Sequence, residues 1–297
     1  MSRLAYVNGR YVPHAQAMVH VEDRGFQFSD GIYEVCALSG GLFLDFEGHM
    51  TRLERSLREM SMAAPMPIRA LSVVMGEVVR RNRVRDGIVY IQITRGVARR
   101  DHPFPTKPVR PSLIVTARSI RPERQEDAAL KGVSVVTTED LRWGRCDIKS
   151  VSLLANVLAI QGAREQGADD AWLFDGDGNV TESSRSSAWI VTQDGTLVTR
   201  YLDRHILPGI TRQTLYDVAV RQGYRVEERA FSVEEAKAAR EAFMTSASAM
   251  VVPVVRIDEA VLGNGRPGSV SLTLRRLYQQ AVGAQMPADG GGTGGSD

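Results

Sequence analysis

The segment Leu141-Arg-Trp-Gly-Arg-Cys-Asp-Ile-Lys-Ser150 places a single lysine, Lys149, between two apolar elements. The run 133–136 before it predicts a strand, and the helical spacing of apolar residues after it predicts a helix over about 151–166. Lys149 would then lie at the start of a helix that buries one face. The apolar positions of that face and the candidate N-caps are Leu153, Leu154, Val157, Leu158, Ser150 and Ser152.

The lysine content of the chain favours amine chemistry at Lys149. The chain has only four lysines, at positions 107, 131, 149 and 237, and otherwise uses arginine. An arginine cannot lose its proton in a protein, whereas a lysine can, and partial burial favours the neutral, nucleophilic amine. Lys149 is therefore a candidate for a Schiff base with a carbonyl compound. An ordinary lysine at the start of a helix is the alternative that this segment leaves open.

The overall composition is typical of a globular protein that acts on small molecules. The 297 residues are enough for two domains or one large one. The net charge of +2, without an isolated basic block, gives no support for binding nucleic acid or a membrane surface. Cys36 and Cys146 form neither a disulfide framework nor a metal-ligand pattern, so we expect no metal. The first residues lack the features of a signal peptide, and no run is long enough for a membrane span, so we expect a cytoplasmic protein.

The N-terminal part of the chain predicts a small α+β domain over residues 1–120. An Asn8-Gly9 pair between apolar runs predicts a hairpin. Strands and helices then follow one another without strict alternation, which favours an α+β arrangement. A long basic loop over 95–105 separates the last two strands. We expect strands over about 32–38, 42–46, 87–94 and 112–117, and helices over about 47–62 and 68–81.

Beyond a charged stretch with prolines, residues 121–131, we expect a larger α/β domain over residues 132–286. We interpret 121–131 as an interdomain linker and the Gly-rich residues 287–297 as a disordered tail. Ser232 and Glu235 predict a capping box. The expected strands lie near 132–138, 171–174, 187–192, 196–199, 224–228, 241–245 and 251–255, and the helices near 151–166, 211–222, 232–240 and 269–285.

Three further positions could act together with Lys149. Glu182 follows a turn-rich segment. If a heterocyclic cofactor were joined to Lys149, the Glu182 carboxylate could keep its ring nitrogen protonated. The alternative is that Glu182 is a solvated hairpin residue. Gly209 directly precedes a helix that begins near Thr211, so free backbone N–H groups could bind an anion there. A glycine turn with a threonine cap is the alternative. Arg52, in His49-Met-Thr-Arg, could reach the same anion or could lie on a solvated helix face.

The chain contains an ordered set of short motifs, which are Glu22-Asp-Arg-Gly-Phe-Gln-Phe-Ser-Asp-Gly-Ile-Tyr-Glu34, His49-x-x-Arg52, Cys146-Asp-Ile-Lys149, Val180-Thr-Glu182, Leu207-Pro-Gly-Ile-Thr-Arg212 and Phe243-Met-Thr-Ser246. This set, over residues 3 to 285, resembles the class IV (fold-type IV) aminotransferases. Within this family, the segment from Glu22 to Val35 and the loop from Thr94 to Pro105 most resemble those of the D-amino acid aminotransferases. The resemblance implies a small N-terminal α+β domain and a larger C-terminal pseudo-barrel, pyridoxal 5′-phosphate as cofactor, and a homodimer with active sites at its interface.

The resemblance also implies roles for individual residues. Lys149 would hold the cofactor and act as the base, and Glu182 would face the ring nitrogen. Tyr33, with Arg100 and His102 of the partner subunit, would bind the substrate carboxylate. The ring and the phosphate would be held by Leu207, Arg52, Ile210, Thr211, Ser246, Ala247 and Ser248.

Two positions depart from the family pattern. Ala247 stands where relatives often carry threonine, so one hydroxyl donor is lost. Arg185 interrupts the serine-rich run after Glu182, where it could contact the phosphate or point away.

The activity that the resemblance implies is transamination between a D-amino acid, such as D-alanine or D-glutamate, and a 2-oxo acid by a ping-pong mechanism. An aminodeoxychorismate lyase, a branched-chain L-amino acid aminotransferase and an (R)-selective amine transaminase share the fold and are the alternatives. The pair Arg100 and His102 argues against the branched-chain enzyme. A binding protein that merely keeps the fold is disfavoured by Lys149 and Glu182. The preferred side chain of the substrate stays open.

Overall fold

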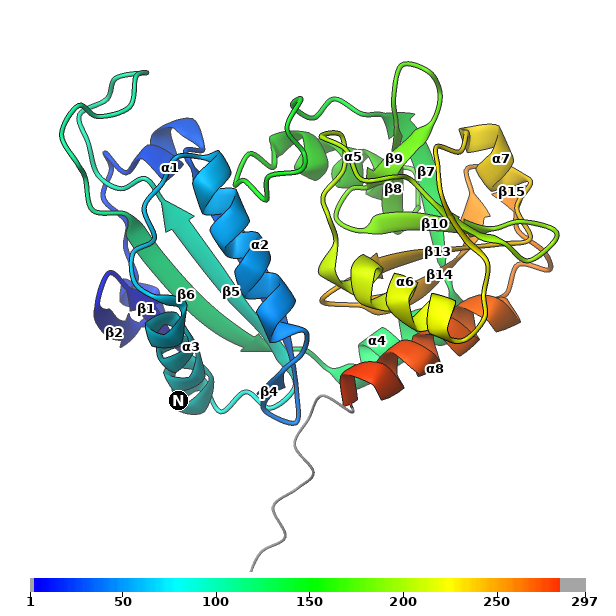
Figure 1. The fold of residues 1–297 in the computed structure, drawn as a ribbon, viewed down its shortest axis with the longest axis horizontal. Helices are drawn as coiled ribbons and strands as arrows, with labels where there is room; N and C mark the ends of the chain where they lie inside the picture. The colour runs from blue at the N-terminus through cyan, green and yellow to red at the C-terminus, as the bar shows by residue number, and fades with distance from the viewer. Residues whose placement is uncertain (1–2, 284–297) are drawn as a thin grey trace, which may run out of the picture.

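The computed structural model describes residues 3–283, apart from the side chains of residues 122 and 124, and contains two β-sheets side by side (Figure 1). The first sheet has six strands in the order β2-β1-β6-β5-β3-β4. Its central strands β3, β5 and β6 pair antiparallel along their length. The strands are β1 (Leu4–Val7), β2 (Arg10–Pro13), β3 (Gly31–Ser39), β4 (Leu42–Phe43), β5 (Gly87–Thr94) and β6 (Ser112–Ser119).

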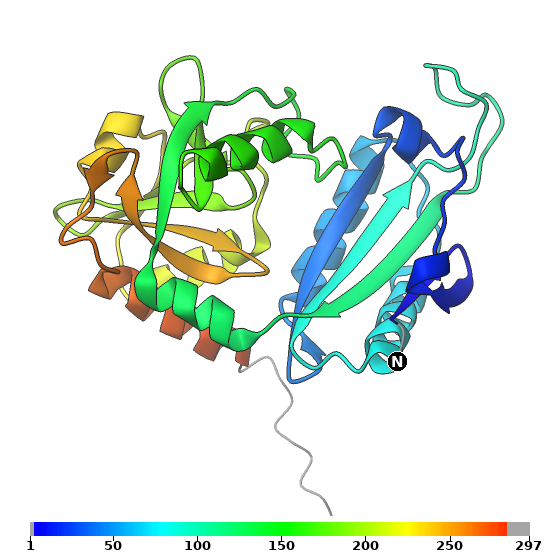
Figure 2. The ribbon, with the colours of Figure 1, turned by 180° about the vertical axis from the view of Figure 1, so that it is seen from behind.

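The alternation of side chains along β3 explains why one face of this sheet is covered. Ile32, Glu34 and Cys36 are buried, whereas Tyr33 and Val35 on the other face are only partly buried. The helices α2 (Phe46–Glu59) and α3 (Ile68–Asn82) pack over the buried face, and Figure 2 shows the other face without such a cover from residues 3–283. The predicted hairpin is confirmed, since β1 and β2 pair across Asn8 and Gly9.

The second sheet has nine strands in the order β12-β11-β10-β13-β14-β7-β8-β9, with β15 paired to β14. It curls around the core of the C-terminal half (Figure 1). The strand β9, which contains Glu182, was not predicted. The strands are β7 (Val133–Glu139), β8 (Asp170–Phe174), β9 (Val180–Ser183), β10 (Ser187–Val191), β11 (Leu197–Thr199), β12 (Val226–Glu228), β13 (Glu241–Ser246), β14 (Met250–Ile257) and β15 (Ala260–Val261).

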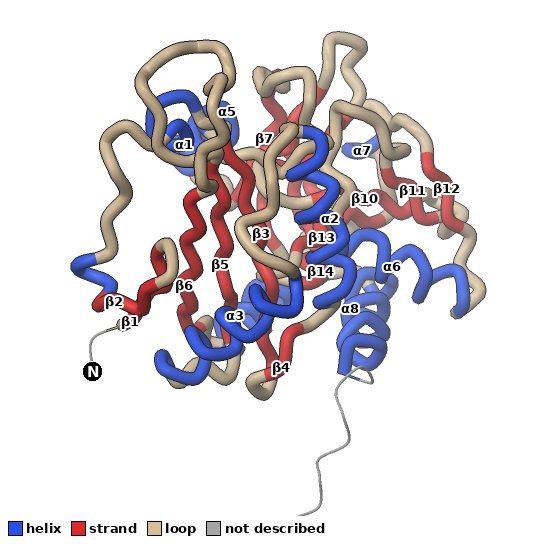
Figure 3. The backbone as a smooth tube through the Cα atoms, turned by 60° about the vertical axis from the view of Figure 1, so that its left-hand side comes forward, coloured by secondary structure: helices blue, strands red, loops and turns tan. Residues whose placement is uncertain are grey.

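Several helices complete the fold, and two of them join the halves of the molecule. The side chain of Asp45, just before α2, accepts hydrogen bonds from Thr214 on α6 (Ile210–Arg221) at 3.1 Å and from Tyr278 on α8 (Ser269–Gly283) at 2.8 Å. Figure 3 shows the backbones of α2, α6 and α8 next to one another. One half of the predicted capping box is present, since Ser232 accepts from the Glu235 backbone N–H, whereas the Glu235 carboxylate accepts from Arg229. The remaining helices are η1 (His14–Gln16), α1 (Arg24–Phe28), α4 (Pro122–Lys131), α5 (Leu154–Glu165), α6 (Ile210–Arg221), α7 (Val233–Lys237) and α8 (Ser269–Gly283).

The prediction that the helix after Lys149 buries its apolar face is wrong for the single chain. Leu154, Val157 and Leu158 of α5 are 71, 55 and 63% exposed. The predicted serine caps are also wrong, because α5 starts later, after Leu153, with no side-chain cap from the described residues. The reason is that Ser150 is used elsewhere: it pairs with Ile32 in an isolated bridge to β3.

The predicted linker, residues 121–131, forms the helix α4 between the two sheets. The predicted tail, residues 287–297, lies outside the described residues. Across residues 3–283, none of the helices combines the length and the apolar character that crossing a bilayer would require.

Candidate active site

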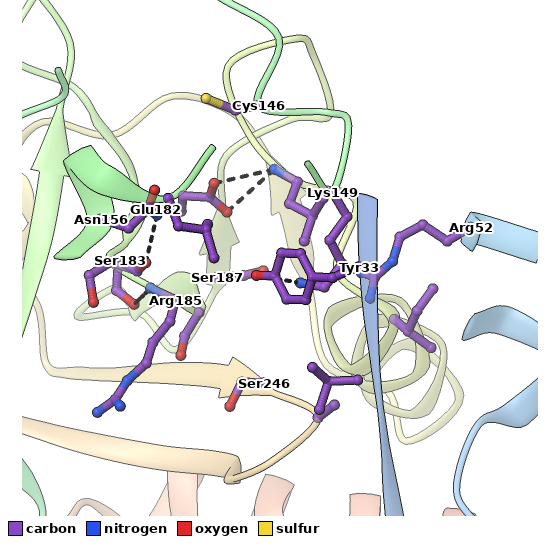
Figure 4. Close-up of a pocket in the computed structure, with 18 of the residues that line it drawn as sticks. Tyr33, Arg52, Cys146, Lys149, Asn156, Glu182, Ser183, Arg185, Ser187 and Ser246 are labelled. Carbon is purple, nitrogen blue, oxygen red and sulfur yellow. Dashed lines mark hydrogen bonds between the residues drawn. The ribbon is translucent and has the colours of Figure 1, made fainter. Parts of the chain in front are cut away.

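A cavity of about 220 Å³ lies between the two halves of the molecule and contains most of the predicted site residues. The first sheet and α2 contribute Tyr33 and Arg52, and most of the other lining residues come from the second half (Figure 4). The predicted residues that line it are Tyr33, Arg52, Lys149, Glu182, Leu207, Ile210, Thr211, Ser246, Ala247 and Ser248.

Lys149 is fixed in this cavity by pairing of its own segment with β3. The Tyr33 backbone N–H donates to the Lys149 carbonyl at 2.9 Å, and the Val151 N–H donates to the Gly31 carbonyl at 3.0 Å. The Lys149 side chain then extends so that Nζ lies 3.3 Å from the Tyr33 hydroxyl and 4.3 Å from the centre of its ring. The amine therefore faces the cavity, which supports the chemical interpretation over an ordinary lysine at a helix start.

Tyr33 is itself held by two residues that the sequence reasoning missed. The rings of Tyr33 and Tyr90 stack with centres 5.6 Å apart, and the Tyr90 hydroxyl donates to Gln92 at 2.7 Å. Burial raises the pKa of Tyr90 to about 12, so its phenol stays protonated and can donate at neutral pH. The alternation of side chains along β5 could have indicated Tyr90 and Gln92. They lie on the same face as Tyr33, because Tyr33 pairs with Gln92 and Val35 pairs with Tyr90 on the neighbouring strand.

Glu182 is buried in β9, so the alternative of a solvated hairpin residue is wrong. Its carboxylate accepts from the Leu207 backbone N–H at 3.3 Å and forms an ion pair with Arg142. Arg142 also contacts Asp140 at 2.7 Å. Burial raises the pKa of Glu182 above its ordinary value, and the guanidinium of Arg142 opposes that shift. Arg142 was overlooked, although it lies only seven residues before Lys149 in the sequence.

Arg52 is also buried, which excludes the solvated helix face considered for it. Its Nε and Nη2 donate to the carboxylate of Glu34 at 3.0 and 2.6 Å, and its Nη1 donates to the Pro208 carbonyl at 2.9 Å. His49 contacts the same carboxylate at 3.0 Å. Burial alone would raise the pKa of Glu34, but Arg52 and His49 outweigh burial and hold it well below its ordinary value. Glu34 thus keeps Arg52 fixed at the edge of the cavity.

The part of the cavity beside Arg52, where α6 begins, is suited to an anion. The helix α6 begins there after Gly209, and no described side chain caps its first N–H groups. Thr211 is 2% exposed, and its hydroxyl oxygen has no hydrogen-bond partner among residues 3–283. A Cβ on Gly209 would lie only 2.8 Å from the Ser187 hydroxyl, so a larger residue there would require the Ser187 side chain to move. Free N–H groups, a helix dipole and a buried, unpaired hydroxyl together form a seat for a phosphate.

Arg100 and His102 are the two predicted residues that do not line the cavity of their own chain, as far as the described residues show. Both lie against Phe28 of α1: the Arg100 guanidinium is 4.8 Å and the His102 ring 5.5 Å from the centre of the Phe28 ring. Arg24 anchors the loop by donating to the Asp101 carbonyl at 2.6 Å. The loop therefore has a defined position outside this cavity.

Arg185 lies at the rim of the cavity and points away from Lys149 (Figure 4). Its side chain is 62% exposed, and its Nε is 3.4 Å from the Asp170 carboxylate. The turn beneath it is tightly held, since Ser184 donates to Asp170 at 2.5 Å and Asn156 donates to the Ser184 carbonyl at 2.7 Å. Of the two predicted alternatives for Arg185, the structure favours the outward one.

Comparison with known proteins assigns the fold and the site to one family. Residues 31–257 match the family model described as amino-transferase class IV. The chain belongs to this family of aminotransferases.

Two similar curated relatives are both named D-alanine aminotransferase. The protein from Listeria innocua is 38% identical over 93% of this chain and 95% of its own length. The protein from Staphylococcus haemolyticus is 37% identical over 93% of this chain and 97% of its own length.

Solved structures agree with the assigned fold. A branched-chain amino acid aminotransferase solved with pyridoxamine 5′-phosphate superimposes with a TM-score of 0.87 at 27% identity, over 97% of this chain and 96% of the other. A branched-chain aminotransferase from Escherichia coli has a TM-score of 0.85 at 22% identity over 98% of both chains, which shows the fold alone. The predicted fold-type IV architecture is confirmed.

Proposed function

We propose that this protein transfers amino groups between D-amino acids and 2-oxo acids with pyridoxal 5′-phosphate as cofactor. The observation that carries the proposal is the position of Lys149, whose Nζ faces a two-sided cavity beside Tyr33 and opposite the buried Glu182. The curated relatives named D-alanine aminotransferase support the D-amino acid as substrate. Their alignment extends over nearly the whole chain, so both halves of the cavity fall within it.

The residues present fit the cofactor. The phosphate would bind at the start of α6, where Thr211 has a buried hydroxyl without a partner among residues 3–283, with Ser246 and Ser248 on the facing turn. We propose that Arg52 adds positive charge there and that Leu207 packs against the ring. Ala247 offers only its backbone N–H. Glu182 would face the ring nitrogen, since its carboxylate lines the cavity, and the ion pair with Arg142 favours its charged form against the effect of burial.

When bound, the cofactor supplies an electron-withdrawing ring that stabilises negative charge on the substrate α-carbon. Lys149 Nζ would take the proton from that α-carbon and then donate it to the C4′ carbon of the cofactor. The Tyr33 hydroxyl, 3.3 Å from Nζ, orients the amine. We propose that the same hydroxyl binds the substrate carboxylate. Arg142 and Glu182 form a buried ion pair beside the proposed position of the ring.

We further propose that two copies of the chain form a homodimer. The exposed apolar side chains of α5, Leu154, Val157 and Leu158, form a continuous stripe at helical spacing that a second copy could cover. The loop with Arg100 and His102 lies outside its own cavity, which supports delivery of both side chains to the cavity of the partner. There, Arg100 could form charge-assisted hydrogen bonds with the substrate carboxylate.

The cytoplasm is the proposed location. The two cysteines are free thiols, Cys36 and Cys146, which is typical of a reducing compartment. We also propose the domain division at residues 1–120 and 132–286, with α4 between them.

A substrate panel tests the activity. D-alanine, D-glutamate, L-valine and (R)-1-phenylethylamine would each be incubated with 2-oxoglutarate or pyruvate, and 4-amino-4-deoxychorismate would be added alone. We expect 2-oxo acid products from the D-amino acids and ping-pong kinetics. Pyruvate released from 4-amino-4-deoxychorismate without an acceptor would identify a lyase instead. Activity with L-valine alone would identify a branched-chain enzyme.

A further inference from the structure

The turn between β13 and β14, residues 246–250, forms one wall of the active-site cavity. Ser246, Ala247 and Ser248 all line the cavity on this side. The turn is a tight one, because Met250 adopts a left-handed conformation with φ of 62°. A non-glycine residue in this conformation is strained, so surrounding contacts must hold it in place.

A second cavity lies behind this turn, so side-chain packing does not support it from both sides. This cavity has a volume of about 200 Å³ and is lined by Ala247, Met250 and Arg275, with Leu38 and Gly87 from the first sheet. Ala247 thus borders a cavity on each side. The shape of the turn must therefore depend on polar contacts more than on close packing.

Arg275 of α8 supplies the strongest of those contacts. It is only 4% exposed. Its Nη1 donates to the carbonyl of Ala249 at 3.0 Å and to that of Val251 at 2.8 Å, on the two sides of Met250. One guanidinium nitrogen thus closes the turn around its strained residue. The planar guanidinium leaves Nη2 free to bond an acidic partner at the same time, a two-nitrogen geometry that a lysine amine cannot reproduce.

The helix α4, which follows the first sheet in the chain, contacts both Arg275 and the 246–250 turn. Glu126 accepts from Arg275 Nη2 at 3.0 Å, and Gln125 donates to the Ser248 carbonyl. Glu126 is 52% exposed at its side chain, so this ion pair is only partly shielded from water. Arg275 thereby joins three elements: α8, α4 and the turn.

We propose that Arg275 is a positioning residue for the cofactor phosphate, which it serves by fixing the 246–250 turn from behind without touching the phosphate. The inference rests on the proposed function, because it takes that turn as part of the phosphate seat. It explains how a turn that lacks a threonine hydroxyl at Ala247 can still present its backbone N–H groups in a fixed geometry. Arg275 would therefore govern affinity for the phosphate end of the cofactor and leave the reaction at Lys149 unaffected.

The test compares cofactors with and without a phosphate. Dissociation constants for pyridoxal 5′-phosphate and for pyridoxal would be measured by absorbance titration of the apoprotein, and inorganic phosphate would be titrated as a competitor. For Arg275→Lys we expect the constants for pyridoxal 5′-phosphate and inorganic phosphate to rise about ten-fold, as expected for losing hydrogen bonds from a charged donor, with no change for pyridoxal. The kcat at saturating cofactor should stay near the wild-type value.

Two further variants keep the result interpretable. Glu126→Gln removes the partly exposed ion pair and should raise the same two constants several-fold while the protein stays folded. Arg276→Ala, the exposed neighbour on α8, is the matched control and should change none of them. The inference would be overturned if the dissociation constants for pyridoxal and for pyridoxal 5′-phosphate rose equally. It would also be overturned if neither Arg275→Lys nor Glu126→Gln raised the constant for pyridoxal 5′-phosphate. A wild-type protein that binds no pyridoxal 5′-phosphate would instead overturn the proposed function.

Discussion

Lys149 and Tyr33 are joined twice, once through their backbones and once through their side chains. The Tyr33 N–H donates to the Lys149 carbonyl at 2.9 Å, and Lys149 Nζ lies 3.3 Å from the Tyr33 hydroxyl. The nucleophile from one half of the molecule is therefore aligned by a strand of the other half. Because the backbone bond fixes both chain segments, a change in the position of β3 would carry the amine with it.

Replacement of Lys149 by alanine should abolish transamination and the visible absorbance of the bound cofactor, since no other lysine of the described residues lines the cavity. Absorbance spectra and a coupled assay with D-alanine and 2-oxoglutarate would measure both. Lys131→Ala is the control, because the Lys131 side chain is 77% exposed and is not part of the cavity lining. Full activity in Lys149→Ala would end the proposed function.

Replacement of Arg100 by alanine should raise the KM for D-amino acids. Loss of charge-assisted hydrogen bonds costs about 1.5–3 kcal/mol, which corresponds to about a 10- to 150-fold rise. Steady-state kinetics with D-alanine would measure it, with the neighbouring Arg99→Ala as the control. An unchanged KM would remove Arg100 from carboxylate binding.

A mixed dimer would show whether Arg100 acts across the interface. Chains carrying only Lys149→Ala would be combined with chains carrying only Arg100→Ala. If the partner supplies Arg100, one of the two sites in the mixed dimer holds both defects and the other holds neither. About half the wild-type activity per dimer is then expected. No recovery beyond that of the parent variants would show that both residues act within one chain.

Replacement of Glu34 by glutamine should destabilise the protein at neutral pH by about 3–5 kcal/mol, because the buried charge of Arg52 loses its partner. The pKa of Glu34 is lowered in the folded protein, so this ion pair is fully stabilising above the unfolded pKa of about 4.3. Below that pH the unfolded carboxylate binds a proton while the folded one stays ionised, and the advantage shrinks. Urea unfolding should show that the difference in free energy of unfolding between wild type and variant is smaller at pH 3 than at pH 7. An equal difference at both pH values would contradict the prediction.

Replacement of Leu158 by glutamate should shift the protein toward monomers and lower its activity without lowering its folding stability. Leu158 is 63% exposed in the single chain, so the charge costs little unless a partner covers it. Sedimentation velocity and thermal unfolding would separate the two effects. Val220→Glu, at an exposed position on α6, is the control. A variant that remains dimeric with full activity would place the interface elsewhere.

The sequence predicts the strands of the first sheet well, because their periodicity is local. Lys149, Glu182 and the start of α6 could also be found, since each lies at a junction between recognisable elements. Arg142 could not be assigned to Glu182, because only the folded chain brings these residues together across 40 positions. The buried pair of Glu34 and Arg52 was missed for the same reason.

The exposed stripe of α5 shows a different limit. Its apolar spacing predicts the helix, but the prediction that the chain buries this face is wrong, because the spacing does not say which part of the protein would cover it. In the single chain the stripe is open, and the segment before it is occupied by the pairing of Ser150 with Ile32.

The pairing of residues 149–151 with the start of β3 has a consequence for how the chain can be divided. A fragment ending near residue 120 would leave that stretch of β3 as a bare edge, with donors and acceptors open to association with other chains. In the complementary fragment, residues 149–151 would have no strand to pair with, so the position of the Lys149 amine would no longer be fixed. Neither piece should therefore work as an independent module, and genetic splitting at α4 should yield activity only when both pieces are produced together.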